Sequence, residues 1–182
     1  MRRRRLWLAG MAICALLVPW LGNVVYPWPY QSAFLAAGRR YGISPYLLAG
    51  VARAESRFDP TARSRRGAIG IMQVLPETGA YLTGRSESAV SVSLLSPQYS
   101  IHVGAQYLAL LRDEFRNDTA AIAAYNGGDA TVRGWIRSGV WRPGESPQRI
   151  PYPETANFVE RVQRNARWYA FLYPGRTPAR AK

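Results

Sequence analysis

Apolar side chains recur along this chain of 182 residues at the spacing of an α-helix. One such stripe begins at Ile101 and continues through Ala105 and Leu108. No run of strand length from residue 31 onward shows a convincing alternation of apolar and polar residues, the pattern of a half-buried β-strand. The sequence therefore predicts an all-α fold, and its length leaves room for one domain, which we expect at residues 31–173.

Capping residues and prolines suggest where the helices begin and end. A serine followed by proline, or a proline alone, marks an expected helix start at Ser44 and Pro45, at Ser96 and Pro97, and at Pro153. Asp118 is expected to cap a short helix that Gly127 and Gly128 end. Loops are expected at residues 58–70, 83–95 and 139–153.

The first thirty residues differ from the rest in composition. Residues 2–5 are all arginine, and the 20 residues from 6 to 25 include no charged side chain. A helix of that length, rising ~1.5 Å per residue, reaches across a ~30 Å hydrocarbon core. Because positive charge is retained on the cytoplasmic side, the rest of the chain is expected outside the cytoplasm. Residues 1–30 are thus expected to be a signal anchor in the inner membrane, or a cleaved signal peptide, followed by a proline-rich spacer at residues 26–30.

Charge and cysteine content restrict the partners. The net charge is +13 and favours polyanions, which for an exported protein means anionic cell-wall polymers and lipid headgroups rather than nucleic acid. The basic tail at residues 174–182 is expected to be disordered. The single cysteine, Cys14, lies in the uncharged segment, so the exported part has no thiol for a disulfide, a metal site or a nucleophile.

Several catalytic classes are excluded by what is missing. His102 is the only histidine, and it is expected to be a solvated surface residue. A histidine-based zinc site or a serine–histidine–aspartate triad would rest on that one residue. There is also no glycine-rich phosphate loop, and we predict neither a metal nor a cofactor. Carboxylate, hydroxyl and amide chemistry remain.

Glu55 is the carboxylate with the most unusual placement. Val51 and Leu48 precede it by four and seven positions, so Glu55 shares the apolar face of its expected helix. Burial there would raise its pKa and keep it protonated near neutrality, as a general acid requires. The alternative is an ordinary helix-end salt bridge with Arg53 or Arg57.

Four motifs in order resemble those of the family 1 lytic transglycosylases, which carry a soluble-lytic-transglycosylase domain of lysozyme-like fold. The resemblance covers roughly residues 31–173. The motifs are Glu55-Ser56-Arg57-Phe58-Asp59-Pro60 with Ser64; Gly67-Ala68-Ile69-Gly70-Ile71-Met72-Gln73 with Pro76 and Thr78; Ala124-Tyr125-Asn126-Gly127; and Pro151-Tyr152-Pro153-Glu154-Thr155 with Phe158 and Val159.

The resemblance implies cleavage of peptidoglycan by one catalytic carboxylate. Glu55 would protonate the glycosidic oxygen between N-acetylmuramic acid and N-acetylglucosamine. It would then take the proton of the muramic acid 6-hydroxyl, which closes onto C1 and leaves a 1,6-anhydro end. A two-carboxylate glycosidase needs a second Asp or Glu across the bond, but we interpret the nearest one, Asp59, as a helix-end cap.

The resemblance also implies a substrate groove beside Glu55. Its expected lining residues are Ser64, Met72, Gln73, Thr78, Tyr125 and Asn126. Glu154 is expected in the same cleft, bonded to Tyr125 or to a sugar amide. Two of these residues have plainer interpretations, since Met72 could fill the core and Glu154 could favour a first helical turn.

Two other functions remain open from the sequence. A hydrolytic muramidase of goose-type lysozyme character would share the fold and the glutamate but use water. A non-catalytic wall-binding component of an envelope machine would not need a carboxylate on the apolar face of a helix. The compact size and the apolar segment favour a specialised periplasmic enzyme, anchored in the inner membrane or secreted, that opens the wall for a secretion or conjugation apparatus.

Overall fold

The computed structural model describes residue 22 and residues 24–175. Most of the uncharged segment at residues 6–25, and residues 176–182 of the expected tail, lie outside the described residues. Among the helices that are described, none combines the length and the apolar character needed to cross a bilayer.

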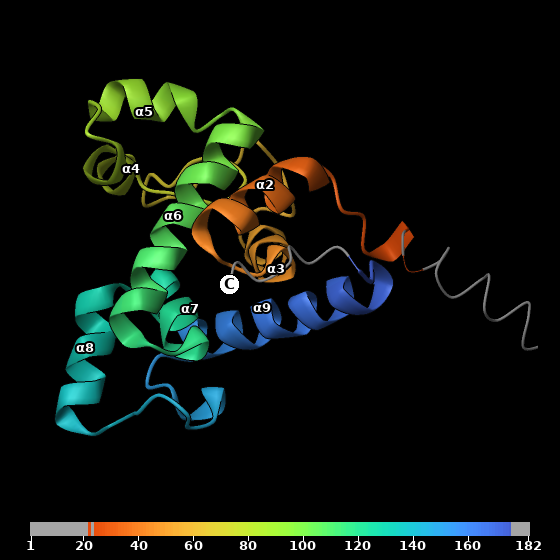
Figure 1. Ribbon diagram of the computed structural model, residues 1–182. Coiled ribbons are helices and arrows are strands. Elements are labelled where there is room, and N and C mark those ends of the chain that lie inside the picture. Colours follow the sequence, from red (N-terminus) through yellow and green to blue (C-terminus); the bar gives the residue numbers. More distant parts are fainter. Residues whose placement is uncertain (1–21, 23, 176–182) are drawn as a thin grey trace, which may run out of the picture.

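The described part of the chain consists of helices and loops, which confirms the predicted all-α fold (Figure 1). Two isolated β-bridges join Ile69 to Arg63 and to Val74. The helices in chain order are α2 (Gln31–Tyr41), α3 (Pro45–Glu55), α4 (Pro76–Thr83), α5 (Glu87–Ser93), α6 (Pro97–Phe115), α7 (Asp118–Gly127), α8 (Asp129–Ser138), the short 3₁₀ helix η1 (Pro147–Arg149) and α9 (Pro153–Leu172).

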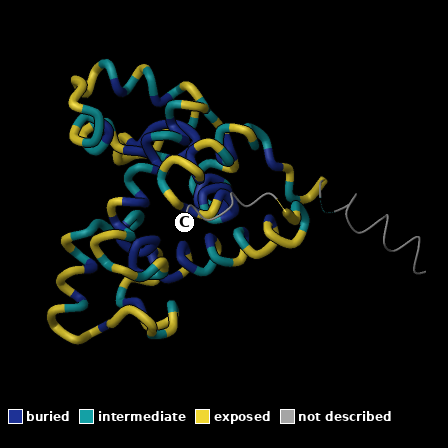
Figure 2. Tube along the Cα trace, in the orientation of Figure 1, coloured by how far each residue is buried: buried dark blue, intermediate teal, exposed yellow. Residues whose placement is uncertain are grey.

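Helix α3 forms the centre of the domain, and its middle residues are buried (Figure 2). It packs along α9, while α6 packs against α2 and α7. Gly50 allows the close approach of α3 to α9, because a Cβ atom there would lie 2.8 Å from the Val162 carbonyl oxygen. The last residue of α3, Glu55, is therefore held at the edge of the core.

The predicted helix starts at Pro45, Pro97 and Pro153 are confirmed. The predicted cap of α7 is wrong by one residue: the Asn117 side chain accepts the hydrogen bond from the Ala120 amide, and Asp118 is the first helical residue. An acid there still favours the helix through the backbone dipole.

The predicted loop at residues 83–95 is wrong, because it contains α5. This helix of 7 residues begins where the Ser86 hydroxyl accepts a hydrogen bond from the Ala89 amide. Its one buried side chain, Val90, packs against Gly79 of α4. Such a short helix depends on tertiary contact rather than on its own propensity. The predicted loop at 139–153 contains the short helix η1. Helix α8, which follows α7 directly, was not predicted.

Residues 26–30, which we name the strap, pack against α9 rather than standing free as a spacer. Trp28 is buried, with its ring 5.4 Å from that of Tyr169 between centroids. The Tyr169 hydroxyl donates to the Pro27 carbonyl (3.0 Å) and the Tyr173 hydroxyl donates to the Tyr26 carbonyl (2.9 Å). The packing of the domain therefore includes the strap.

Replacing Trp28 with alanine tests this packing. Loss of a buried indole should lower the free energy of unfolding by about 3 kcal/mol. The change is measured by urea denaturation, with Tyr81→Ala as the control, because Tyr81 is 80% exposed and should shift the value by less than about 0.5 kcal/mol. Equal stability of the two variants would mean that the strap does not belong to the core.

Candidate active site

Glu55 lines a cleft of about 880 Å³. The carboxylate follows the buried turn formed by Val51 and Ala52 and is itself only partly exposed. Four segments build the walls: the strap through Tyr26, the end of α3, the loop at residues 56–75, and α9, which contributes Arg161, Arg164 and Asn165. Ser64 and Gln73 face the cleft from the loop.

The 56–75 loop is held by its own hydrogen bonds. The Ser56 hydroxyl donates to the Ile71 carbonyl (2.8 Å). Gln73 lies in the left-handed region with φ of 48°, and its side-chain Nε2 donates to the carbonyls of Ala62 (3.1 Å) and Gly70 (2.9 Å). A Cβ atom on Gly70 would come within 2.2 Å of the Leu94 carbonyl oxygen. The loop is thereby fixed beside Glu55.

Burial raises the pKa of Glu55 from an ordinary value of 4.5 to about 8. The positive charge of Arg161 opposes this shift, and the negative charge of Glu154 adds to it. The position of Glu55 at the carboxyl end of α3 disfavours a negative charge as well. Near pH 7 a carboxyl group with this pKa is about 90% protonated.

The alternative of a helix-end salt bridge is not found in the described part of the chain, where no arginine lies within ion-pair distance of Glu55. Arg53 instead donates to the Val25 carbonyl (2.9 Å) and lies over the Tyr26 ring at 4.1 Å. The carboxylate therefore remains directed to the cleft without a neutralising partner.

A second hollow of about 200 Å³ continues the site on the other side of Gln73, which lines both spaces. Thr78, Tyr125 and Asn126 line this second hollow. The Thr155 hydroxyl donates to Oδ1 of Asn126 (2.8 Å). Of the predicted groove residues, Ser64 and Glu55 thus lie in one hollow, Thr78, Tyr125 and Asn126 in the other, and Gln73 between them.

The expected hydrogen bond between Tyr125 and Glu154 is not formed. Its hydroxyl donates to the Met72 carbonyl oxygen at 2.8 Å. Burial and the negative charge of Glu55 raise the pKa of Tyr125 well above its ordinary value, so the hydroxyl keeps its proton. Glu154 is exposed in the first turn of α9, where the helix dipole favours an acid, and it acts on Glu55 through its charge.

Met72 contributes its backbone rather than its side chain. The side chain is fully buried against Gly104, where a Cβ atom would lie 2.6 Å from that of Met72. The Met72 amide donates to the buried Ser100 hydroxyl (3.1 Å). Met72 is therefore a core residue whose carbonyl positions Tyr125.

Comparison with known proteins identifies the family to which this fold belongs. The family model of the transglycosylase SLT domain matches residues 32–146. This chain belongs to that family.

Relatives and solved structures agree with the assignment. The soluble lytic murein transglycosylase of Salmonella typhimurium (strain LT2) is 31% identical over 143 residues, covering 75% of this chain and 22% of the relative. The membrane-bound lytic murein transglycosylase C of Mannheimia succiniciproducens is 38% identical over 115 residues, covering 57% of this chain and 32% of the relative. This chain thus spans a third or less of the length of either relative.

The crystal structure of the 70 kDa soluble lytic transglycosylase from Escherichia coli matches with a TM-score of 0.75 and 26% identity. The match covers 84% of this chain and 26% of that one. It confirms the predicted lysozyme-like transglycosylase fold.

From the sequence, Arg53 and Arg57 were considered only as salt-bridge partners of Glu55, and the other arginines of this cleft were not singled out. Five guanidinium groups line the space around Glu55, from Arg53, Arg57, Arg63, Arg161 and Arg164. Nothing local distinguishes Arg63, Arg161 and Arg164 in a chain with 24 basic residues, of which one is a lysine. Arg161 and Arg164 are one turn apart, but only the packing of α9 on α3 brings that turn to Glu55.

Two expectations about other polar residues need correction. Asp59 does not cap α3: its Oδ1 accepts hydrogen bonds from the amide and the hydroxyl of Thr61, both at 2.8 Å, and so closes a turn within the loop. These bonds lower the pKa of Asp59, which is fully exposed. His102 is not simply solvated, because its Nε2 lies 2.9 Å from the Tyr41 hydroxyl; desolvation and the charge of Arg40 lower its pKa.

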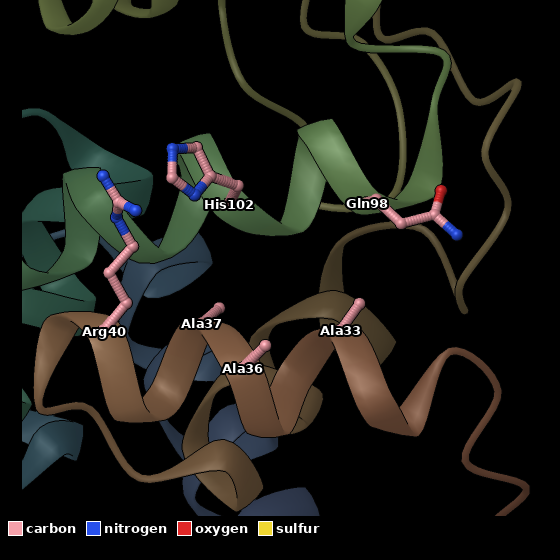
Figure 3. A pocket seen from close by; sticks show the side chains of 6 residues that line it. All are labelled: Ala33, Ala36, Ala37, Arg40, Gln98 and His102. Atoms are coloured by element: carbon pink, nitrogen blue, oxygen red, sulfur yellow. The ribbon is translucent and has the colours of Figure 1, made fainter.

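His102 also borders a third hollow of the SLT domain, about 310 Å³ between α2 and α6 (Figure 3). Ala33, Ala36 and Ala37 line it from α2, with Arg40 at one end and Gln98 at the other (Figure 3). It holds no carboxylate and lies apart from Glu55. In the described residues no three acidic, histidine or cysteine side chains are grouped to bind a metal ion.

Glu55→Gln tests the electrostatic cost of the site. The folded pKa of Glu55 lies above the unfolded value, so the folded state binds the extra proton and wild-type stability falls as the pH rises from about 4.5 to 8. Glutamine has no such dependence. In urea denaturation the variant should match wild type near pH 4.5 and exceed it by about 2 kcal/mol above pH 8, less than the whole shift implies because the carboxylate is partly solvated. A constant difference across this range would contradict the raised pKa.

Proposed function

We propose that this protein is a peptidoglycan lytic transglycosylase. It cleaves the β-1,4 bond between N-acetylmuramic acid and N-acetylglucosamine and forms 1,6-anhydromuramic acid ends. The observation that carries the proposal is the single carboxylate in the cleft: among the residues that line the two hollows, Glu55 is the only acid, and its pKa is about 8.

Such a carboxyl group can act first as acid and then as base. The protonated Glu55 gives its proton to the glycosidic oxygen as the bond from that oxygen to C1 breaks. The resulting carboxylate takes the proton of the muramic acid 6-hydroxyl while that oxygen bonds to C1. Glu55 is protonated again at the end, and no water is consumed. General acid and base action of this kind contributes roughly 10²–10⁴ in rate, and positioning supplies much of the rest.

The polar groups of the groove are suited to hold a sugar chain. Both Nε2 hydrogen bonds of Gln73 go to backbone carbonyls, which leaves its Oε1 as the acceptor for substrate. Asn126 has the complementary arrangement, because its Oδ1 is bonded to Thr155 and its amide hydrogens remain to donate. We assign sugar contacts to these two residues, to Ser64 and to Thr78, and a supporting role beside the reacting centre to Tyr125.

The relatives support the reaction type. Those compared above are called lytic murein transglycosylases. A matching solved structure, with a TM-score of 0.71 and 26% identity, is an inactive glutamate-to-glutamine mutant of lytic transglycosylase Slt from Pseudomonas aeruginosa.

We further propose where the protein works. Residues 31–173, with the strap, form the catalytic domain on the periplasmic side of the inner membrane. Residues 6–25 anchor it or direct its export, and residues 174–182 form a basic tail. Peptidoglycan strands are the proposed substrate, and a secretion or conjugation apparatus that needs an opening in the wall is the proposed partner.

Glu55→Gln should abolish cleavage of purified sacculi, lowering the rate by roughly 10²–10⁴ because the proton donor is lost. Mass spectrometry of wild-type digests should show anhydro ends that resist borohydride reduction. Glu77→Gln is the matched control, since this exposed glutamate in the first turn of α4 lines neither hollow. Reducing ends would identify a hydrolytic muramidase instead, and equal inertness of wild type and Glu55→Gln would identify a wall-binding component.

The pH profile of kcat/KM should have an alkaline limb near pH 8, where Glu55 loses the proton it must donate. Glu154→Gln removes a negative charge that raises this pKa, so the limb should move to lower pH. Arg161→Gln removes a positive charge that lowers it, so the limb should move to higher pH. Identical limbs in all three proteins would exclude Glu55 as the titrating acid.

A further inference from the structure

The acidic residues of this chain are confined to its middle. All 11 of them lie from Glu55 to Glu160. Among the described residues, the strap and α3, which precede or end at Glu55, pack on the second half of α9, which follows Glu160. The described part of this end therefore carries arginines, and the acids at its border are Glu55 and Glu160.

One stripe of α9 faces away from the core at this end. Arg161, Arg164, Trp168 and Phe171 follow one another at helical spacing and are exposed, whereas Val162, Asn165 and Tyr169 are buried on the opposite side. Trp168 is 44% exposed and Phe171 is 64% exposed. Their rings lie 5.9 Å apart between centroids, and the Tyr26 ring lies 5.8 Å from Trp168. Neighbouring large aromatic side chains in such a position indicate a surface that meets a partner.

The start of the described chain lies beside the same stripe (Figure 1). A Cβ atom on Gly22 would be 2.2 Å from Cδ2 of Leu172, so the chain passes against the last turn of α9. Val24 and Val25 follow and are exposed. The uncharged run at residues 6–25 therefore ends next to Trp168 and Phe171.

The charges beside these aromatic rings select the partner. Arg164 and Arg167 are exposed on α9, and the salt bridges of the described residues involve only Arg133 and Arg149 among the arginines. Aromatic rings at the level of lipid headgroups, with arginines that reach anionic lipids, are the usual composition of a membrane-contacting surface. A second copy of the chain would bring like charges together instead.

We propose that this surface of the folded domain, formed by Val24, Val25, Tyr26, Arg164, Arg167, Trp168 and Phe171 and named the lipid-facing patch, rests on an anionic bilayer surface. Arginines near such a surface are attracted to its negative charge, and this attraction acts in addition to any anchoring by residues 6–25. The proposal concerns where the domain lies and does not depend on glycan cleavage.

Contact of the patch with lipid would also orient the catalytic cleft. Tyr26 and Arg164 belong to both surfaces, since each lines the cleft that holds Glu55. One end of the cleft would then stay at the membrane, and glycan strands would be cut close to the bilayer rather than deep in the wall.

Spin labelling of the full chain tests the patch. With Cys14→Ser to remove the native thiol, a nitroxide is attached at Phe171→Cys, or at Tyr81→Cys on α4 as the water-exposed control. The proteins are reconstituted in phosphatidylcholine vesicles with and without phosphatidylglycerol. Electron paramagnetic resonance then measures the accessibility of each label to oxygen and to a nickel chelate.

We expect the label at 171 to lose nickel accessibility and gain oxygen accessibility when phosphatidylglycerol is present, while the label at 81 stays in water. Arg167→Glu should reverse this change, and Arg137→Glu, an exposed arginine on α8, should not. Equal accessibility at 171 in both lipids, or protection in detergent that grows with protein concentration, would overturn the proposal.

Activity on purified sacculi keeps the two proposals separate. Neither Phe171 nor Arg167 lines the cleft, so Phe171→Ser and Arg167→Glu should digest sacculi at the wild-type rate in detergent. A loss of lipid contact with full activity would leave the transglycosylase function standing. Lipid contact in a chain that cuts no glycan would leave the patch standing.

Discussion

The packing of α3 on α9 determines the position of every group in the cleft. At Gly50 the two helix backbones are so close that a methyl group would meet the Val162 carbonyl oxygen at 2.8 Å and the Ala166 amide nitrogen at 3.1 Å. The Asn165 side chain donates to the Gly50 carbonyl (3.4 Å) at the same crossing. One turn further along α3 comes Glu55, and one turn back along α9 comes Arg161. The approach that buries the core thus also brings the carboxylate to the guanidinium that moderates its pKa.

This arrangement keeps an acid protonated at the expense of stability. A carboxylate that is desolvated and lacks a salt-bridge partner favours unfolding at neutral pH, because the unfolded chain solvates the charge. The fold limits the effect by leaving Glu55 partly exposed and by setting the positive charge of Arg161 against the negative charge of Glu154. Full neutralisation by a close arginine would restore stability but would also remove the proton that a general acid has to donate.

Structural features that depend on residues adjacent in the sequence could be predicted. Features that depend on tertiary packing could not. Proline at a helix start fixes the backbone locally, and Pro45, Pro97 and Pro153 accordingly mark real starts. The short helices α5 and α8 are stabilised by distant contacts, such as that of Trp135 on α8 with Tyr152, whose rings lie 5.0 Å apart. No local pattern contains that information.

The same division applies to the site. The apolar face that holds Glu55 could be deduced from its spacing to Val51 and Leu48, because both lie on one helix. The arginines of the cleft come from three separate segments, so no spacing relates them. Met72 shows the limit of a motif match, since a matched position can act through a backbone carbonyl while its side chain fills the core.

Strain in the 56–75 loop determines which polar atoms of the groove are available to the proposed glycan substrate. Arg57, Phe58 and Gln73 all have positive φ values, which costs about 1–3 kcal/mol for each non-glycine residue unless neighbouring contacts impose the conformation. Here Phe58 is buried and the Gln73 amide is bonded to two carbonyls, so the contacts that hold the loop also use up its donors. The acceptor of Gln73 and the donors of Asn126 then remain available in the hollow that both residues line. A groove with fixed and complementary polar atoms orients a glycan without rearranging, which is the contribution that a single carboxylate cannot make for itself.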